Sequence, residues 1–447
     1  MSDLVTSRIF VDGEKGITAA KLNDIIAGAS VQTDFVATKP TASTLDPADN
    51  LLVLKSSGQY AKTPFQTIVD SVQGQLPSND SEIWSVRLRS FNSVGNCNFE
   101  CDQRSVGATL TNPATGTLPL DRWAHGKVGT MVVSVGQQAA ALPDVCVPTT
   151  SFRITRSFYR VTLTTAQASL GVSDTLRLSQ SIEGPMWREL SNDVHSLQVL
   201  VRSSVANLKF ALAFSDPATT TKTLVKLATI PTANTWTLLT FPNLPVWPSG
   251  NFSASPGVLG YLFSITLAAG ANLTSPAADT WQSGSFLGAP GMSSFAASPV
   301  NSTFDIAFIQ HEPGPVCSTL IDKPFTQNLT ECQRYFAKSM PYATAVGADS
   351  AGFVSFHSPV AVSVSTSLFG GRGFPVPMAK APTVTFFKHD DGTGNQGYYY
   401  NSAVPAGAAI AFTGSSANQN ALTAIRGNAS LAGPIMIITG FTADTGW

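Results

Sequence analysis

The chain between residues 82 and 312 is built from short runs in which hydrophobic and polar residues alternate, separated by turn residues. Side chains of a strand point alternately to the two faces of a sheet, so this alternation, rich in β-branched and aromatic residues, predicts strands. Seven runs fit: residues 130–135, 151–155, 159–163, 196–201, 208–214, 236–241 and 259–267. Eight or more strands over this length predict a jelly-roll β-sandwich, to which we assign residues 79–320.

A second set of strand patterns follows closer to the C-terminus. It comprises residues 353–356, 383–387, 409–412 and 434–439. The longest hairpin loop of this set is expected over residues 389–397. We therefore predict a C-terminal β-sandwich and assign residues 321–447 to it and to a short linking helix that precedes it.

The linking helix is predicted over residues 331–339, with Thr330 as its cap and Pro341 as its stop. Helical spacing places Cys332, Tyr335 and Phe336 on one face, so a short amphipathic helix is expected to fill the junction between two β modules. We expect Cys332 and Tyr335 to be buried there and to form no functional site.

Residues 1–78 predict a small α/β module. Thr18 is a predicted helix cap, and Ile17 and Leu22 occupy the two positions of a hydrophobic staple around it. Leu22, Ile25 and Ile26 form an apolar stripe along the same helix. These residues predict a helix of about three turns that attaches the chain to a larger assembly.

The same module also predicts a hairpin and a second helix. The hairpin consists of strands over residues 50–54 and 60–62. The capping box at residues 63–66 marks the start of a helix that extends to about residue 72. A module of this size buries little core by itself, so it requires copies of itself or another protein as a partner.

The composition favours a turn-rich β protein with weakly charged surfaces. Only 12% of residues are charged, the net charge is −1, and there are 35 glycines and 28 prolines. A chain without a basic surface attracts neither nucleic acid nor anionic lipid, so neither is expected as a partner. No apolar run approaches the roughly 18 residues of a membrane span, and the first residues do not resemble a secretory signal. We expect synthesis in a cytosol and no membrane insertion.

The cysteines and histidines indicate no cofactor and no metal. The five cysteines are scattered, and Cys97 and Cys101, four residues apart, are followed by no second Cys or His pair at ligand spacing. Both are expected to be buried free thiols.

Glycoside hydrolysis usually requires two facing carboxylates. Glu183 and Glu189 flank Trp187, an aromatic residue that could stack on a sugar. We interpret Glu183 as structural and Glu189 as a solvated loop charge, so the chain is not expected to be an enzyme.

Residues 398–400 are three consecutive tyrosines. Strand alternation places Tyr398 and Tyr400 on one face and Tyr399 on the other. Aromatic faces stack on sugar rings, and the neighbouring Asn395 and Gln396 can bind hydroxyl groups, so these residues are candidates for host or glycan contact. A subunit interface or a core would use the same tyrosines equally well.

Several motifs occur in an order that resembles a family of bacteriophage tail fibre and minor tail proteins. In the centre of the chain they are Gln103-Arg104, Asp121-Arg122-Trp123, Gln180-Ser181-Ile182-Glu183, Leu200-Val201-Arg202, Trp281, the Gln-x-Glu-x-Gly turn at residues 310–314, and the segment 331–339. Residues 374–385 and 441–444 resemble the family's C-terminal part, and residues 16–23 and 49–54 resemble segments that dock fibres onto a tail. The chain departs from the pattern at Asn96-Cys97-Asn98, where the family has Asn-Gly-Asp, and at Ala379, where Arg is usual.

The resemblance implies a central jelly-roll similar to a carbohydrate-binding module, a homotrimer, and a place in the virion tail. The implied partners are further copies of the chain, phage tail or adaptor proteins, and host cell-surface polysaccharide. A glycan-cleaving tailspike enzyme and a head or collar decoration fibre remain the alternatives.

Overall fold

The computed structural model describes residues 50–54, 60–64, 91–139, 156–217, 222–318, 320, 323–347, 354–358, 368–388, 391–427, 430–431 and 433–447. The chain divides into two compact units, residues 1–83 and 84–447. In the first unit the structure describes one antiparallel pair, β1 (Asn50–Leu54) and β2 (Tyr60–Pro64). This pair confirms the predicted hairpin. The first predicted helix, with Ile17, Leu22, Ile25 and Ile26, lies outside the described residues. The second was predicted to begin at residues 63–66, but Thr63 and Pro64 belong to β2, where they pair with β1, and the rest of that helix lies outside the described residues.

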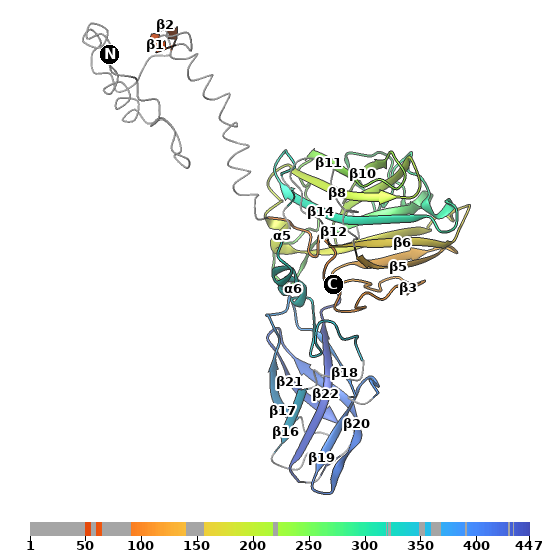
Figure 1. Cartoon of the computed structure of the whole chain (residues 1–447), viewed down its shortest axis with the longest axis vertical. Coiled ribbons are helices and arrows are strands. Elements are labelled where there is room, and N and C mark those ends of the chain that lie inside the picture. Colours follow the sequence, from red (N-terminus) through yellow and green to blue (C-terminus); the bar gives the residue numbers. More distant parts are fainter. Residues whose placement is uncertain are drawn as a thin grey trace, which may run out of the picture. The chain divides into compact units, whose positions relative to one another are not determined.

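The first part of the second unit is a sandwich of two six-stranded antiparallel sheets (Figure 1). One sheet has the order β13-β10-β9-β12-β7-β4 and the other β11-β8-β14-β6-β5-β3. The strands of the first sheet are β4 (Ala124–Val128), β7 (Thr175–Glu183), β9 (Leu208–Ser215), β10 (Lys222–Ile230), β12 (Leu259–Ala269) and β13 (Trp281–Ser283). Those of the second are β3 (Leu110–Thr111), β5 (Val132–Ala139), β6 (Ser157–Thr165), β8 (His195–Ser203), β11 (Thr237–Leu244) and β14 (Thr303–Pro313).

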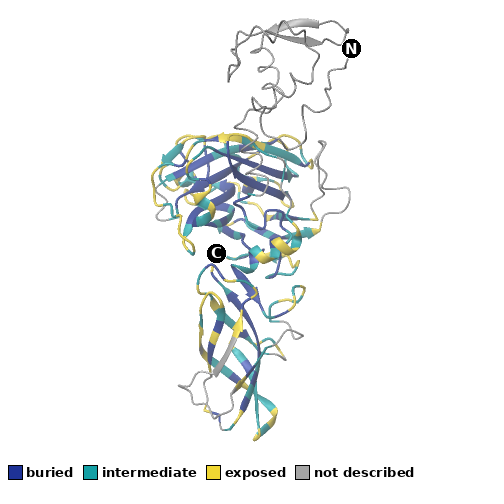
Figure 2. Ribbon diagram, turned by 90° about the vertical axis from the view of Figure 1, so that its left-hand side faces the viewer, coloured by how far each residue is buried: buried dark blue, intermediate teal, exposed yellow. Residues whose placement is uncertain are grey.

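The core of the sandwich lies between the two sheets, where alternate residues of each strand face inward. Its largest fully buried side chains include Trp123, Tyr159, Tyr261, Phe210 and Phe304. Figure 2 shows this interior in dark blue, under a more exposed surface. A helical turn, α5 (Gly184–Arg188), follows β7, and two 3-10 turns, η2 (Ala271–Leu273) and η3 (Phe295–Ala297), lie in the long connection from β12 to β14.

The second part of the unit is an eight-stranded antiparallel sheet with its own core. Its strands are β15 (Phe336–Lys338), β16 (Val354–Ser358), β17 (Leu368–Gly373), β18 (Thr383–Phe387), β19 (Gln396–Asn401), β20 (Val404–Ala417), β21 (Ala421–Gly427) and β22 (Ile435–Asp444). β22 pairs with four of them: β16 and β19 along its first half, and β15 and β18 along its second. The mainly β fold with a central sandwich is therefore confirmed, and the second β module is this sheet built around β22.

The linking helix differs from its predicted position. Helix α6 spans Phe325–Gln333 with Pro324 as its N-cap, and residues 336–338 form β15. Thr330, predicted as the cap, instead lies inside the helix, where its hydroxyl donates to the Thr326 carbonyl at 2.8 Å. Pairing of β15 with β22 overrides the local helical pattern. Cys332 and Tyr335 are buried as predicted.

Candidate functional site

The sandwich and the C-terminal sheet are joined by an ion pair whose carboxylate is buried. Glu183, at the end of β7, accepts hydrogen bonds from Arg334 Nη2 at 2.6 Å and Nε at 3.0 Å, just after α6. Its remaining acceptor positions are taken by the Tyr335 hydroxyl at 2.8 Å and the Gly257 N–H at 2.7 Å. Burial by itself raises the pKa of Glu183, but these hydrogen bonds together hold it below its usual value. Glu183 is thus an ionised, fully satisfied structural carboxylate.

The Asp-Arg-Trp motif packs against the same junction. Asp121 accepts hydrogen bonds from the backbone and side chain of Gln103, both at 3.0 Å, and burial raises its pKa to about 6. Arg122 stacks on the Tyr335 ring, with its guanidinium carbon 3.5 Å from the ring centroid. Trp123 enters the sandwich core and donates to the Asn96 carbonyl. Each residue of the motif therefore has a structural role.

Two further motifs meet at the end of β22. Arg104 forms a two-point pair with Asp444, at 2.5 and 3.1 Å, and lies over the ring of Phe336 in β15. Gln103 also donates to the Phe336 carbonyl at 3.1 Å. Lys338, which lies within the segment predicted as a helix, is buried in β15 and donates to three backbone carbonyls. The motifs that carry the family resemblance thus gather largely where the two β modules join.

The Gln-x-Glu-x-Gly turn has a structural explanation as well. Gln310 donates to the Glu312 carboxylate at 3.0 Å, and Ser318 donates to it from its backbone N–H and its hydroxyl. The glycine, Gly314, has a positive φ of 110°. These contacts fold the segment after β14 back along β8, where Gln198 donates to the Ser318 carbonyl.

A buried polar chain runs through one end of the sandwich core. His195 Nε2 lies 3.1 Å from the Pro245 carbonyl, so it donates there and leaves Nδ1 to accept from His311 Nε2 at 2.8 Å. His311 Nδ1 then accepts from the Tyr261 hydroxyl at 2.7 Å, which is also 2.8 Å from the Ser93 hydroxyl. Burial lowers the pKa of His195 to about 3 and that of His311 well below its usual value. Both rings are therefore neutral and structural.

Glu183 and Glu189 do not have the arrangement that glycoside hydrolysis requires. Both oxygens of Glu183 are occupied, whereas Glu189 is exposed and pairs with Arg188 on the surface. Trp187 stacks on Phe252 with ring centroids 5.4 Å apart. The three residues do not form a pair of facing carboxylates beside a sugar-stacking ring.

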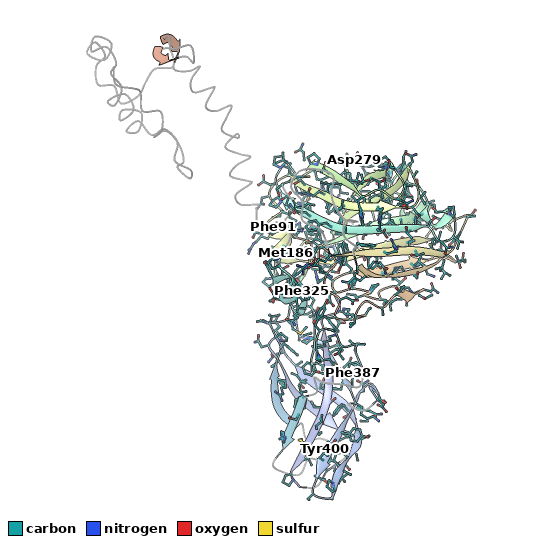
Figure 3. The ribbon with its side chains drawn as sticks, in the orientation of Figure 1. Phe91, Met186, Asp279, Phe325, Phe387 and Tyr400 are labelled. Atoms are coloured by element: carbon teal, nitrogen blue, oxygen red, sulfur yellow. The ribbon has the colours of Figure 1, made fainter. Side chains whose placement is uncertain are left out.

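The tyrosines of β19 follow the predicted alternation. The rings of Tyr398 and Tyr400 lie 6.3 Å apart on one face, and Tyr399 packs against the core of the C-terminal sheet. Figure 3 labels Tyr400 on this strand. Tyr399 thus faces the core while Tyr398 and Tyr400 share the opposite face, and all three side chains are half-exposed.

Gly407 in β20 has no side chain and so leaves room for the Tyr398 and Tyr400 rings. A Cβ on Gly407 would lie 2.5 Å from the Tyr400 ring and 3.1 Å from the Tyr398 ring, and its φ is +82°. The rings therefore lie directly against the glycine backbone, which no other residue would permit without displacement.

The same face extends across the sheet. Tyr400 pairs with Met436 of β22, and Met436 pairs with the exposed His357 of β16. In the next row Tyr398 pairs with the half-exposed Ile438. We define the tyrosine face as Tyr398, Tyr400, Met436, Ile438 and His357.

The two amide residues proposed with the tyrosines have different positions. Gln396 lies in β19 two residues before Tyr398, so alternation places it on the tyrosine face. Asn395 adopts a left-handed φ of 57° in the turn before the strand and fixes it through its backbone, with its side chain exposed. The predicted loop is correspondingly shorter, because Gln396 and Gly397 already belong to β19.

Cys97 and Cys101 are buried free thiols, as predicted. Among the described residues, no group of three His, Cys, Asp or Glu side chains is arranged to hold a metal ion. No helix in the described ranges has the length and apolar character needed to cross a membrane.

No protein family model matches this chain, and no curated protein matches it. Among solved structures it is similar to TmCBM61 in complex with β-1,4-galactotriose, at 11% identity and a TM-score of 0.25, over 50% of this chain and 99% of that one. It is also similar to the enzymatically active domain of bacteriophage CBA120 tailspike protein 4, at 12% identity and a TM-score of 0.25, over 50% and 22% of the two chains. The family 11 carbohydrate-binding module of Clostridium thermocellum, in complex with a β-1,3-1,4-mixed-linked tetrasaccharide, matches at 12% identity and a TM-score of 0.22, over 46% and 98%. At these TM-scores the similarities carry no inference about what this chain binds.

Proposed function

We propose that this chain is a homotrimeric component of a bacteriophage tail, a fibre or fibre-like adaptor, whose C-terminal sheet contacts host surface glycans through the tyrosine face. The single observation that carries the binding role is the placement of the Tyr398 and Tyr400 rings side by side over Gly407. Two half-exposed aromatic rings on a rigid sheet form a platform that stacks on sugar rings. Gln396 on the same face supplies a hydrogen-bonding amide.

The virion role is supported by the ordered family motifs of the sequence and by where they lie. Two partly buried ion pairs join the sandwich to the C-terminal sheet, Glu183 with Arg334 and Arg104 with Asp444. A fibre that transmits contact from its binding end to the particle requires such a fixed joint. We propose no catalytic role, because the Glu183 oxygens are fully engaged.

Binding is tested on isolated host-cell envelopes and on purified host polysaccharide with the whole chain. The double variant Tyr398→Ala/Tyr400→Ala should lose at least ten-fold in affinity, while Tyr342→Phe, whose ring lies at the joint, should bind as the wild type. Unchanged binding by the double variant would overturn the glycan-contact role.

Assembly and attachment need separate experiments. Light scattering after size exclusion should give three times the chain mass, and a monomer at micromolar concentration would contradict the trimer. Deletion of residues 1–78 should leave a soluble oligomer that is absent from virions, whereas normal incorporation would refute attachment through the N-terminal module.

A further inference from the structure

Two arginines on the outer face of the second sandwich sheet share one carboxylate. Tyr159 and Phe304 face the core, so strand alternation places Arg160 and Asp305 on the opposite face, away from the first sheet. Asp305 of β14 pairs in register with Arg160 of β6 on one side and with Arg202 of β8 on the other. We define the arginine row as Arg160, Asp305 and Arg202, which cross the three central strands of this sheet.

The carboxylate of this row is fully engaged, whereas the guanidinium groups are not. Asp305 Oδ1 accepts a hydrogen bond from Arg160 Nε at 2.7 Å. Its Oδ2 accepts from Arg160 Nη2 at 2.9 Å and from Arg202 Nε and Nη2 at 3.0 and 2.8 Å. Nη1 of each arginine has no hydrogen-bond partner among the described residues. Two positive charges thus share one negative charge, and the row is positively charged.

The arginine row is accessible from solvent. The side chain of Arg160 is 32% exposed and that of Arg202 is 18% exposed. In the adjacent row of the same face, Thr303 pairs with Thr162, and Thr162 pairs with Ser134, and all three residues are half-exposed. A ligand on this face can therefore contact both guanidinium groups and a line of hydroxyl groups.

Aromatic rings beneath the two arginines hold them in place. The guanidinium carbon of Arg202 lies 4.5 Å from the centroid of the Trp236 ring and 5.4 Å from that of Phe158. The guanidinium carbon of Arg160 lies 5.2 Å from the Phe158 centroid. Both arginines are thus restrained by a ring and by Asp305, so they lose less conformational entropy when they bind a further anion.

The charge of the row is not balanced by another carboxylate of the sheet. Among the six strands of this sheet the only other carboxyl group belongs to Glu312, at the opposite end of β14, where it binds Ser318. A guanidinium donates paired hydrogen bonds to a carboxylate, and protein hydroxyl groups exchange hydrogen bonds with sugar hydroxyls. A saccharide with a carboxylate would supply the missing negative charge and use the adjacent hydroxyl groups.

We propose that the arginine row is a binding site for the carboxylate groups of an acidic polysaccharide. The Nη1 groups of Arg160 and Arg202 bind the carboxylate, and the hydroxyl groups of the adjacent row bind the sugar beside it. The choice of a polysaccharide rests on the proposed contact with host glycans, but the site lies on the sandwich and shares no residue with the tyrosine face. It selects its ligand by charge, whereas the tyrosine face binds by stacking.

The test is calorimetric titration of the whole chain at low salt with trigalacturonate, with maltotriose and acetate as separate probes. Trigalacturonate should bind about ten-fold more tightly than either of them, because only it combines a carboxylate with a saccharide. Arg160→Met still covers Phe158 and leaves a neutral pair of Arg202 and Asp305, so it should weaken trigalacturonate binding about ten-fold. Lys209→Met is the matched control: it removes one positive charge from an exposed position of β9 in the other sheet and should bind as the wild type.

Absence of trigalacturonate binding to the wild type would overturn the proposal, as would equally tight binding of acetate or equal losses in the two variants. If Arg160→Met does not fold, the wild type is titrated again with sodium chloride raised from about 0.05 M to about 0.5 M, which should weaken trigalacturonate binding about five-fold. An affinity that does not change with salt would refute a site selected by charge. Because these titrations use a soluble oligosaccharide, their outcome is separate from the envelope binding that tests the tyrosine face.

Discussion

Glu183 and Arg334 form a two-point ion pair although 151 residues separate them in the sequence, and the Glu183 side chain is only 3% exposed. The pair fastens the end of β7 to the residue that follows α6. Tyr335, next to Arg334, adds a third hydrogen bond and stacks beneath Arg122. Loss of either charge therefore acts on the sandwich and the C-terminal sheet together.

Arg334→Ala should destabilise the chain by about 2–4 kcal/mol, because it leaves the Glu183 carboxylate buried without its cation. The figure is below that of a fully buried pair since Arg334 is 35% exposed. Urea unfolding followed by tryptophan fluorescence measures it. Arg188→Ala, which breaks the exposed pair with Glu189, is the control and should change the stability by less than about 0.5 kcal/mol. Equal effects of the two variants would contradict the role of the joint.

The His195–His311 pair should make the sandwich sensitive to acid. Both pKa values are lowered in the folded state, so the unfolded chain binds more protons once the pH falls below about 6.5, the ordinary histidine value. Their stabilising contribution is therefore present above pH 6.5 and decreases as the pH falls below it. For His195 it is lost progressively down to about pH 3, by about 1.4 kcal/mol per pH unit, and His311 acts in the same direction.

The pKa of Asp121 is raised to about 6, so protonation of this residue favours the folded state as the pH falls, opposite to the histidines. The histidine effect must therefore be measured as a difference between the wild type and a histidine variant. The free energy of unfolding is compared between pH 7 and pH 5 for the wild type and for His195→Gln. The variant should be less stable at pH 7 but lose less on acidification. Parallel pH profiles would show that His195 does not contribute.

Gly257→Ala should cost about 2–3 kcal/mol. Its φ is +70°, and a Cβ there would lie 2.7 Å from the Ala379 carbonyl oxygen. Positive φ alone costs an alanine about 1 kcal/mol, and the clash would also displace the N–H that binds Glu183. Gly116→Ala separates the two causes, since Gly116 has a φ of +89° but nothing within 4 Å of its Cβ position. The melting temperature of Gly257→Ala should be well below that of Gly116→Ala. The reverse order would exclude a clash at the joint.

Gly407→Ala should weaken binding through the tyrosine face without removing either ring. The added methyl group would push Tyr400 and Tyr398 out of their positions over the backbone. We expect an affinity loss of about five-fold or more for host envelopes. Gly433→Ala, with a φ of +72° and no atom near its Cβ position, controls for backbone strain. An affinity equal to that of the wild type would mean that the relative placement of the rings does not matter.

Local composition was sufficient where a run is rich in apolar and β-branched residues. The strands over residues 50–54 and 383–387 were predicted to the residue. β7 and β4 were missed because their outward positions hold Ser179, Ser181 and Gly126, which resemble loop residues rather than a strand face. β15 was mistaken for helix because its strand conformation depends on a partner more than 100 residues away.

The candidate sites show the same division. The alternation of Tyr398 and Tyr400 could be predicted from the sequence, since it depends on neighbours along one strand. The contact of both rings with the Gly407 backbone could not, because it depends on the register between β19 and β20. The contact between His195 and His311 could not be predicted either, because it joins β8 to β14.

The position of β22 within its sheet constrains how this part of the chain folds. Asp444 of β22 pairs with Phe336, and Thr439 of β22 pairs with Val354. Both partners are therefore synthesised long before β22. Contacts between residues so far apart require large loops to close before they contribute stability, which slows folding. Until β22 is in place, β15, β16, β18 and β19 present unpaired edges, and in that interval they are open to pairing with strands of other copies of the chain.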